Sequence, residues 1–355
     1  MSGAVQSFTL NPTNSAVAVV ATTNGGLWRT TDSGSTWTPV AQSNTTFTSL
    51  SFGAVAYDAT DSNVLVAGYG RFSSLGGRGG AQAGMLRSTD GGVTWASING
   101  AGSVIPRHHQ VTTSGVSNVK FAFGANDTAW AAVVNNSGVV NGVFRSADNG
   151  ATWSAASLDT AVGGSTLNPG FQGGTHLSIT ADPTNDQIVY VGGDRTPASP
   201  FGAQMFRINS SLASGSQGSL FYGADTSNNS IPHADTRSMG FDAAGRFWLA
   251  NDGGMYRRDD VTAGAGQWVS LNAGLRTTEV TGVAYHRLTK ALITGQQDNA
   301  TAVMAPGTTV NTAFASKVWT SLLSGDGGLL ALSGAAGRWR FRRSAATRPV
   351  TVIAA

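Results

Sequence analysis

The chain contains no cysteine and few charged residues, and both shortages limit what it can be. Without cysteine, neither disulfides nor thiolate metal sites can form, and this absence fits cytosolic and secreted bacterial proteins alike. Charged residues make up 12% of the chain, about half the usual share. Glu279 is the single glutamate, and there are three lysines. Because strong helix formers other than alanine and leucine are scarce, long exposed helices are not expected.

No apolar run approaches the roughly 20 residues of a membrane span. The N-terminus has neither a basic segment nor an apolar one, so no signal peptide is visible in this chain. The formal charge of +3 comes from residues 338–355, which hold five arginines and no acid; without them the charge is −2. A nucleic-acid-binding domain needs a basic face, and the body of this chain gives no sign of one.

The sequence is instead rich in glycine, with 47 residues in 355, and it repeats one short stretch three times. The copies are Thr30–Trp37, Ser88–Trp95 and Ser146–Trp153, and their aspartates lie 58 residues apart. Each copy follows a glycine, two apolar residues and an arginine. A fixed period near 50 residues predicts stacked supersecondary units.

The chemistry of this stretch is that of a tight turn. The aspartate can accept hydrogen bonds from backbone N–H groups two or three residues on, and the glycine can adopt a positive φ. The tryptophan can fold back and bury an apolar face. We therefore assign a structural role to these residues of the three copies: Asp32, Gly34, Trp37, Asp90, Gly92, Trp95, Asp148, Gly150 and Trp153.

The pattern Ser/Thr-x-Asp-x-Gly-x-Thr-Trp resembles the Asp-box, or bacterial neuraminidase (BNR) repeat. Such repeats occur in sialidases, xyloglucanases, sortilin-type receptors, a photosystem assembly factor and secreted bacterial proteins named glycosyl hydrolases for their repeats. The resemblance implies an all-β fold: a single β-propeller of four-stranded blades, with the box between the third and fourth strands. It marks the fold well and the function poorly.

Short alternating or β-branched runs predict the strands of the blades. First strands are expected at Gln6–Leu10, Gly53–Tyr57, Val119–Phe123, Leu177–Ala181, Ser238–Phe241 and Gly282–Tyr285. This count predicts six blades and an incomplete seventh. We expect one propeller domain over residues 1–334, followed by a basic tail or last-blade remnant over residues 335–355.

In a propeller, the links between blades and the hairpins between second and third strands share one face, opposite the boxes. Asp252 and Asp298 come from adjacent blades on that face. Glycoside hydrolysis needs an acid and a base or nucleophile, so these two are the candidate catalytic pair. A turn-forming role is the alternative for Asp252, because Asp-Gly favours hairpin turns.

Further polar and aromatic residues are expected around the same face. They are candidates for binding a glycan, with rings that stack on sugars and charged groups that bond hydroxyls: Tyr69, Arg71, Phe72, His176, Arg195, Asp235, Arg237 and Glu279. Phe201 lies in the long loop after Arg195. Local packing is the alternative for the long-loop residues Tyr69, Arg71, Phe72, Arg195 and Phe201. A hydrogen-bonded structural role is the alternative for His176 and Arg237.

The resemblance also limits the activity. Xyloglucanases carry a catalytic aspartate in the first-blade hairpin, where this chain has Asn24, and an amide cannot act as a general base. Sialidases need a Tyr–Glu nucleophile pair and an Arg-Ile-Pro tripeptide, and this chain lacks the tripeptide. Sialidase activity is therefore not expected.

Two hypotheses remain open. The chain is a secreted or cell-envelope, hydrolase-like propeller that acts on or binds polysaccharide, or it is a non-catalytic scaffold for glycan or protein partners. Neither hypothesis calls for a cofactor, a metal, nucleic acid or a membrane span.

Overall fold

The computed structural model describes residues 4–40, 49–70, 84–98, 116–158 and 167–273, and shorter segments beyond residue 274. Those segments are residues 275, 278, 280–285, 292–296, 301–304, 319–323, 330–332, 338–341 and 350–353. The chain divides into two compact units, Met1–Asn251 with Met255–Ser270, and Asp252–Gly254 with Leu271–Ala355. No described helix is long and apolar enough to cross a membrane.

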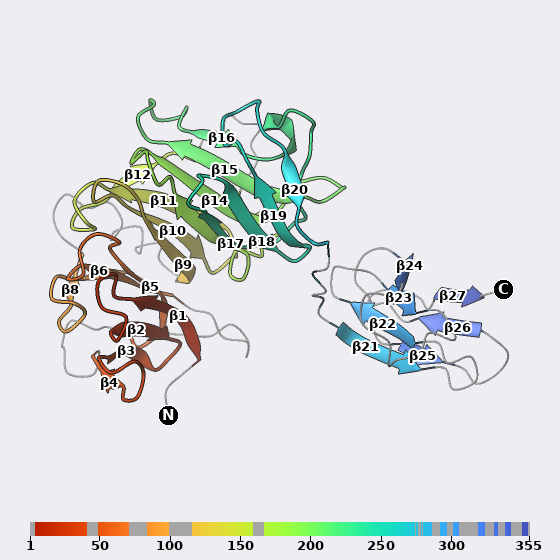
Figure 1. Cartoon of the computed structure of the whole chain (residues 1–355), viewed down its shortest axis with the longest axis horizontal. Helices are drawn as coiled ribbons and strands as arrows, with labels where there is room; N and C mark the ends of the chain where they lie inside the picture. Colours follow the sequence, from red (N-terminus) through yellow and green to blue (C-terminus); the bar gives the residue numbers. More distant parts are fainter. Residues whose placement is uncertain are drawn as a thin grey trace. The chain divides into compact units, whose positions relative to one another are not determined.

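The described residues form antiparallel sheets in sequence order, six with four strands and one with three (Figure 1). The first two sheets contain β1 Val5–Leu10, β2 Ala18–Thr22, β3 Gly26–Thr30, β4 Thr38–Pro39, β5 Phe52–Tyr57, β6 Leu65–Tyr69, β7 Met85–Ser88 and β8 Ala96–Ser97. The next three contain β9 Val116–Phe123, β10 Ala129–Asn135, β11 Val140–Ser146, β12 Ser154–Ala156, β13 Ser178–Ala181, β14 Ile188–Arg195, β15 Ala203–Asn209, β16 Gly218–Leu220, β17 Thr236–Phe241, β18 Phe247–Asn251, β19 Gly254–Arg258 and β20 Trp268–Ser270.

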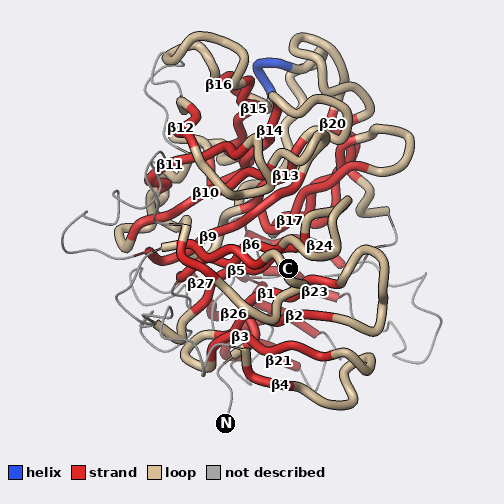
Figure 2. Tube along the Cα trace, turned by 90° about the vertical axis from the view of Figure 1, so that its left-hand side faces the viewer, coloured by secondary structure: helices blue, strands red, loops and turns tan. Residues whose placement is uncertain are grey.

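The second unit contains the remaining two sheets. Their strands are β21 Val280–Tyr285, β22 Leu292–Gln296, β23 Thr301–Met304, β24 Trp319–Leu323, β25 Leu330–Leu332, β26 Arg338–Phe341 and β27 Val350–Ile353. The expected first strands are confirmed in all six four-stranded sheets, with ends shifted by at most three residues. The helical content of the described residues is one short 3-10 turn, Gly223–Asp225, between β16 and β17 (Figure 2).

In the first unit, the first strands of consecutive sheets contact each other, from β1 to β5, β9, β13 and β17. Four apolar clusters fill the four sheet-to-sheet interfaces. The last cluster is aromatic: Tyr190, Phe221, Phe247 and Trp268 pack with ring centroids 4.8–5.8 Å apart. Each inner sheet therefore buries both faces, as its near-continuous apolar strands require.

The three repeated stretches form the turns between third and fourth strands, as predicted, and we call them the repeat turns. In the first, Asp32 accepts hydrogen bonds from the Thr36 N–H (2.9 Å) and hydroxyl (2.6 Å). Asp90 and Asp148 accept the equivalent bonds from Thr94 and Thr152. The main donors thus lie four residues on, rather than the predicted two or three.

Backbone conformation explains the glycine of each repeat turn. Gly34, Gly92 and Gly150 have φ of +87°, +86° and +78°, a region where a Cβ is unfavourable. A Cβ at Gly150 would also lie 2.6 Å from the Val66 side chain of the preceding sheet. The tryptophans fold back as expected in two copies, since Trp95 and Trp153 are buried and donate to the Gly92 and Gly150 carbonyls. Trp37 remains 39% exposed.

The arginine before each repeat turn links its sheet to the next one. Arg29 Nε donates to the Gly91 carbonyl of the second repeat turn (2.9 Å), and Arg87 Nε donates to the Asn149 carbonyl of the third (2.8 Å). In the third sheet, Arg145 reaches the Asp186 carbonyl and carboxylate instead. The fourth sheet, which follows, has no repeat turn, and Arg145 bonds the turn between β13 and β14 of that sheet.

We expect Arg87→Ala to destabilise the first unit by about 1.5–3 kcal/mol, because it removes a charged donor and leaves the Asn149 carbonyl without that bond. Urea unfolding followed by tryptophan fluorescence measures the change. Arg257→Ala is the matched control: its ion pair with the half-exposed Asp259 is a surface contact worth about 0–1 kcal/mol. Equal losses in the two variants would contradict the linking role.

The repeat turns also predict an acid sensitivity. Bonds from the Thr36 hydroxyl and N–H and from Thr30 lower the pKa of Asp32 from 3.8 to about 2. A carboxyl whose folded pKa is lowered stabilises the fold above its unfolded pKa and loses that contribution as the pH falls through the folded value. The urea midpoint should therefore fall between pH 3.8 and about 2, and less steeply in Asp32→Asn. An unchanged slope would contradict the role of Asp32.

Candidate functional site

A buried carboxylate organises the polar end of the fourth sheet. Asp194 is fully buried at the end of β14, and its oxygens accept hydrogen bonds from the backbone N–H groups of Gly170, Gln172 and Arg195. The loop of residues 167–176 is thereby wrapped around one side chain. A Cβ at Gly170 would lie 3.0 Å from both Asp194 Oδ2 and Arg195 Nε, so glycine permits the close approach.

The same loop is fixed at two further points. The buried Asn168 side chain donates to the His176 carbonyl (3.1 Å), and the Gly173 N–H donates to the Gly138 carbonyl of the neighbouring sheet (2.8 Å). Side-chain and backbone bonds thus hold the loop at both ends. Loops held by a rigid scaffold are the usual carriers of binding residues.

This loop brings His176 to Asp235, two of the predicted binding residues. His176 Nε2 lies 3.6 Å from Asp235 Oδ1, and their side chains are 10% and 13% exposed. Asp235 directly precedes β17, has a φ of +69° and donates its N–H to the Asp194 carbonyl (2.7 Å). Two nearly buried ionisable groups from adjacent sheets therefore meet beside the Asp194 loop.

Arg195 and Phe201 form the exposed side of this region. The Arg195 guanidinium carbon lies 4.3 Å from the centroid of the Phe201 ring, within the range of a cation–π contact. Phe201 is 50% exposed, and Phe171, which follows Gly170 in the Asp194 loop, is 68% exposed. Arg195, a predicted binding residue, thus lies against an exposed ring, and Phe171 is an additional exposed ring.

We define the rim site as His176, Asp194, Arg195 and Asp235 with the exposed rings of Phe171 and Phe201. Its residues come from the links before β13 and β17 and from the β14–β15 hairpin. In an antiparallel meander, these connections lie at the end of the strands opposite the repeat turns. This agrees with the face predicted for ligand binding.

The remaining predicted residues are placed as follows. Arg237 is exposed on β17. Asp252 lies in the turn between β18 and β19 and is grouped with the second unit. Asn24, where xyloglucanases are expected to have an aspartate, lies in the β2–β3 turn with a φ of +62°. Arg71, Phe72, Glu279 and Asp298 lie outside the described residues. The separation of the Asp252 and Asp298 carboxyls is therefore still a prediction.

Tyr69 requires a correction. It is 4% exposed and packs in the apolar core of the first two sheets, with its ring centroid 4.9 Å from that of Phe52. A ring in this position cannot stack on a sugar. Tyr69 is the last residue of β6, and its side chain lies on the face of the second sheet that packs against the first sheet.

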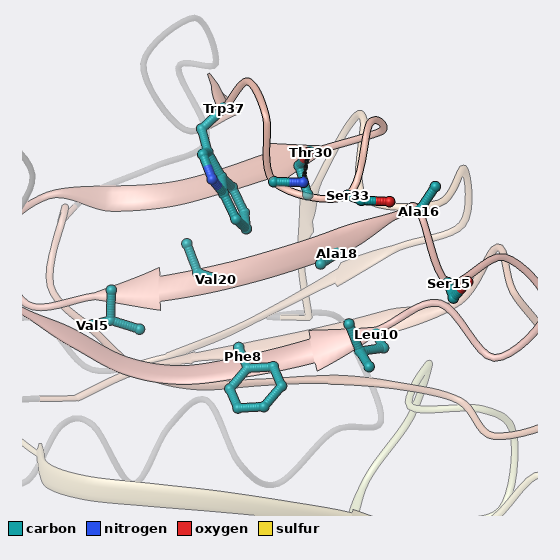
Figure 3. A pocket seen from close by; sticks show the side chains of 11 residues that line it. Val5, Phe8, Leu10, Ser15, Ala16, Ala18, Val20, Thr30, Ser33 and Trp37 are labelled. Carbon is teal, nitrogen blue, oxygen red and sulfur yellow. Dashed lines mark hydrogen bonds between the residues drawn. The ribbon is translucent and has the colours of Figure 1, made fainter.

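An apolar groove of about 360 Å³ lies on the first sheet, lined by eleven residues that include Phe8, Val20 and Trp37 (Figure 3). Alternation along β2 explains it: Val19 and Ala21 point into the core shared with the second sheet, whereas Ala18 and Val20 line the groove. None of its lining residues is ionisable, so this groove is no candidate for acid–base chemistry.

Comparisons with known proteins agree on architecture. No family model and no curated protein matches the sequence. The crystal structure of the GH74 xyloglucanase from Xanthomonas campestris matches with a TM-score of 0.56 and 13% identity over 94% of this chain and 55% of that one. The chain has the β-propeller fold. It spans just over half the length of that enzyme, and at 13% identity the likeness shows the fold alone.

Other similar structures have lower TM-scores. YCF48 from Cyanidioschyzon merolae gives 0.44 at 16% identity, covering 95% of this chain and 91% of that one. The GH74 enzyme of Niastella koreensis gives 0.42 at 17% identity, covering 98% and 64%.

Asp194→Asn should destabilise the rim site, because an amide offers one acceptor oxygen in place of two and turns an NH₂ group toward backbone donors. We expect a loss of about 1–3 kcal/mol in the stability of the first unit, measured by thermal unfolding. Hydrogen exchange should show faster exchange at the Gly170 and Gln172 amides. Asp259→Asn, at an exposed position, is the control; unchanged protection in Asp194→Asn would contradict the assignment.

Proposed function

We propose that the chain is a glycan-active propeller of the Asp-box type, in which the rim site binds the polysaccharide. One observation carries the proposal: the Arg195 guanidinium lies against the exposed ring of Phe201, and the adjacent Asp194 carbonyl accepts the N–H of Asp235, whose carboxylate faces His176. Carbohydrate ligands need apolar ring faces for stacking and charged or polar groups for their hydroxyls. The rim site supplies both on loops held in place by Asp194.

The catalytic part of the proposal rests on Asp252 and Asp298. One carboxylic acid would protonate the glycosidic oxygen while the other carboxylate activates water or attacks the anomeric carbon. A separation of roughly 5–10 Å between the carboxyl groups would suit this chemistry. The proposal includes a secreted or cell-envelope location, a propeller domain over residues 1–334, and a last-blade remnant or basic tail over residues 335–355.

A non-catalytic scaffold that binds glycan or protein is the second candidate. Asn24 favours it, because an amide in a positive-φ turn replaces the catalytic carboxylate that the xyloglucanase resemblance implies. A glycan-binding scaffold predicts the same binding as the first candidate and differs from it in turnover.

The test measures binding and hydrolysis on a panel of plant and bacterial polysaccharides. We expect wild type to bind and to release reducing ends, and Asp252→Asn and Asp298→Asn to bind normally while turnover falls at least 100-fold. Asp259→Asn, which alters an exposed carboxylate outside the rim site, should behave as wild type. Binding without turnover in the wild type would favour the scaffold, and absence of polysaccharide binding would refute the glycan-active propeller and leave only a scaffold for protein partners.

A further inference from the structure

Within the part of the chain that the structure describes, no carboxylate forms an ion pair with Arg195. The one hydrogen bond that its guanidinium makes in this part of the chain is from NH1 to the Thr196 carbonyl (3.3 Å). A guanidinium has five N–H donors, so several remain for a ligand.

The adjacent Asp194 does not neutralise this charge by direct pairing. Its carboxylate is turned toward the N–H groups of Gly170, Gln172 and Arg195 and is fully buried. The guanidinium lies instead against the face of Phe201. This contact fixes the plane of the guanidinium and leaves its edge for an incoming group.

One exposed phenylalanine, Phe171, precedes Arg195 in the sequence, and another, Phe201, follows it. Phe201 contacts it directly, and Phe171 follows Gly170, which approaches Arg195 Nε closely. Phe171 has a φ of +60°, which is rare for a bulky residue, and its carbonyl abuts Gly138 of the neighbouring sheet. The surrounding contacts thus hold a large apolar ring at 68% exposure.

We propose that Arg195, Phe171 and Phe201 bind a carboxylate-bearing sugar of an acidic polysaccharide. The carboxylate pairs with the edge of the Arg195 guanidinium, whose fork of donors matches two carboxylate oxygens. Sugar rings stack on the exposed faces of the two phenylalanines. Because the loop and the guanidinium are already held in place, little conformational entropy is lost on binding.

This inference rests on the proposed glycan function and narrows it to polyuronates. The ligands for the test are polygalacturonate, alginate and hyaluronan oligosaccharides, each paired with its carboxyl-reduced neutral counterpart. The two members of a pair share linkage and size and differ only in the carboxylate. Isothermal titration calorimetry measures the affinity of the full chain for each.

We expect at least one acidic oligosaccharide to bind about 10- to 100-fold more tightly than its neutral counterpart, the range for a charged hydrogen-bonded contact. Arg195→Gln should abolish this preference, whereas Arg257→Gln, which removes a surface charge already paired with Asp259, should keep it. Phe171→Ala and Phe201→Ala should weaken acidic and neutral forms alike, whereas Val93→Ala, at an exposed position of a repeat turn, should not. Unchanged melting temperatures show that each variant is folded.

The outcomes separate the two proposals. Equal affinity for acidic and neutral members of every pair overturns the polyuronate inference and leaves the glycan function standing. An acidic preference that survives Arg195→Gln overturns the assignment to Arg195. Absence of binding to all these oligosaccharides overturns the inference, and the polysaccharide panel above then decides the fate of the glycan function.

Discussion

The hydrogen bond from an arginine to the backbone of the next repeat turn is the contact on which the arrangement of the first sheets depends. Arg29 and Arg87 each leave their own sheet and bond a carbonyl of the following turn. That carbonyl is available because the turn is already closed by its aspartate and by two residues with positive φ. Local turn closure and sheet-to-sheet contact are thus coupled at the second and third repeat turns.

This coupling leaves the opposite ends of the strands open for variation. The repeat turns occupy the end where third strands lead into fourth strands, and apolar clusters fill the spaces between sheets. The connections at the other end add single apolar residues to these clusters, such as Leu167 and Leu177. The fourth and fifth sheets use that freedom to bring Asp194, His176 and Asp235 together in the rim site.

Much of the fold, and part of the site, could be predicted from the sequence. The strand positions followed from alternation and spacing, and the location of His176, Arg195 and Asp235 at the strand ends opposite the repeat turns followed from strand order. The prediction for Tyr69 was wrong, because the sequence does not show which face of the sheet a residue at the end of a strand occupies. Tyr69 lies on the core face, where its ring packs against Phe52. Phe171 and Asn168 were not predicted as site residues. The glycine-rich stretch 168–174 that contains them indicates a loop, but the sequence does not show that this loop wraps around Asp194.

The sequence by itself determined the turns, since an aspartate, a glycine and a threonine at fixed spacing contain nearly all the atoms that close them. It also determined which strands alternate and where the arginines stand. Only the tertiary structure decided which carbonyl each arginine reaches, which rings remain exposed and which carboxylate is buried. Those outcomes depend on contacts between residues far apart in the sequence, from Asp194 with Gly170, 24 positions apart, to Arg87 with Asn149, 62 positions apart. Such contacts exist only once loops and neighbouring sheets have packed.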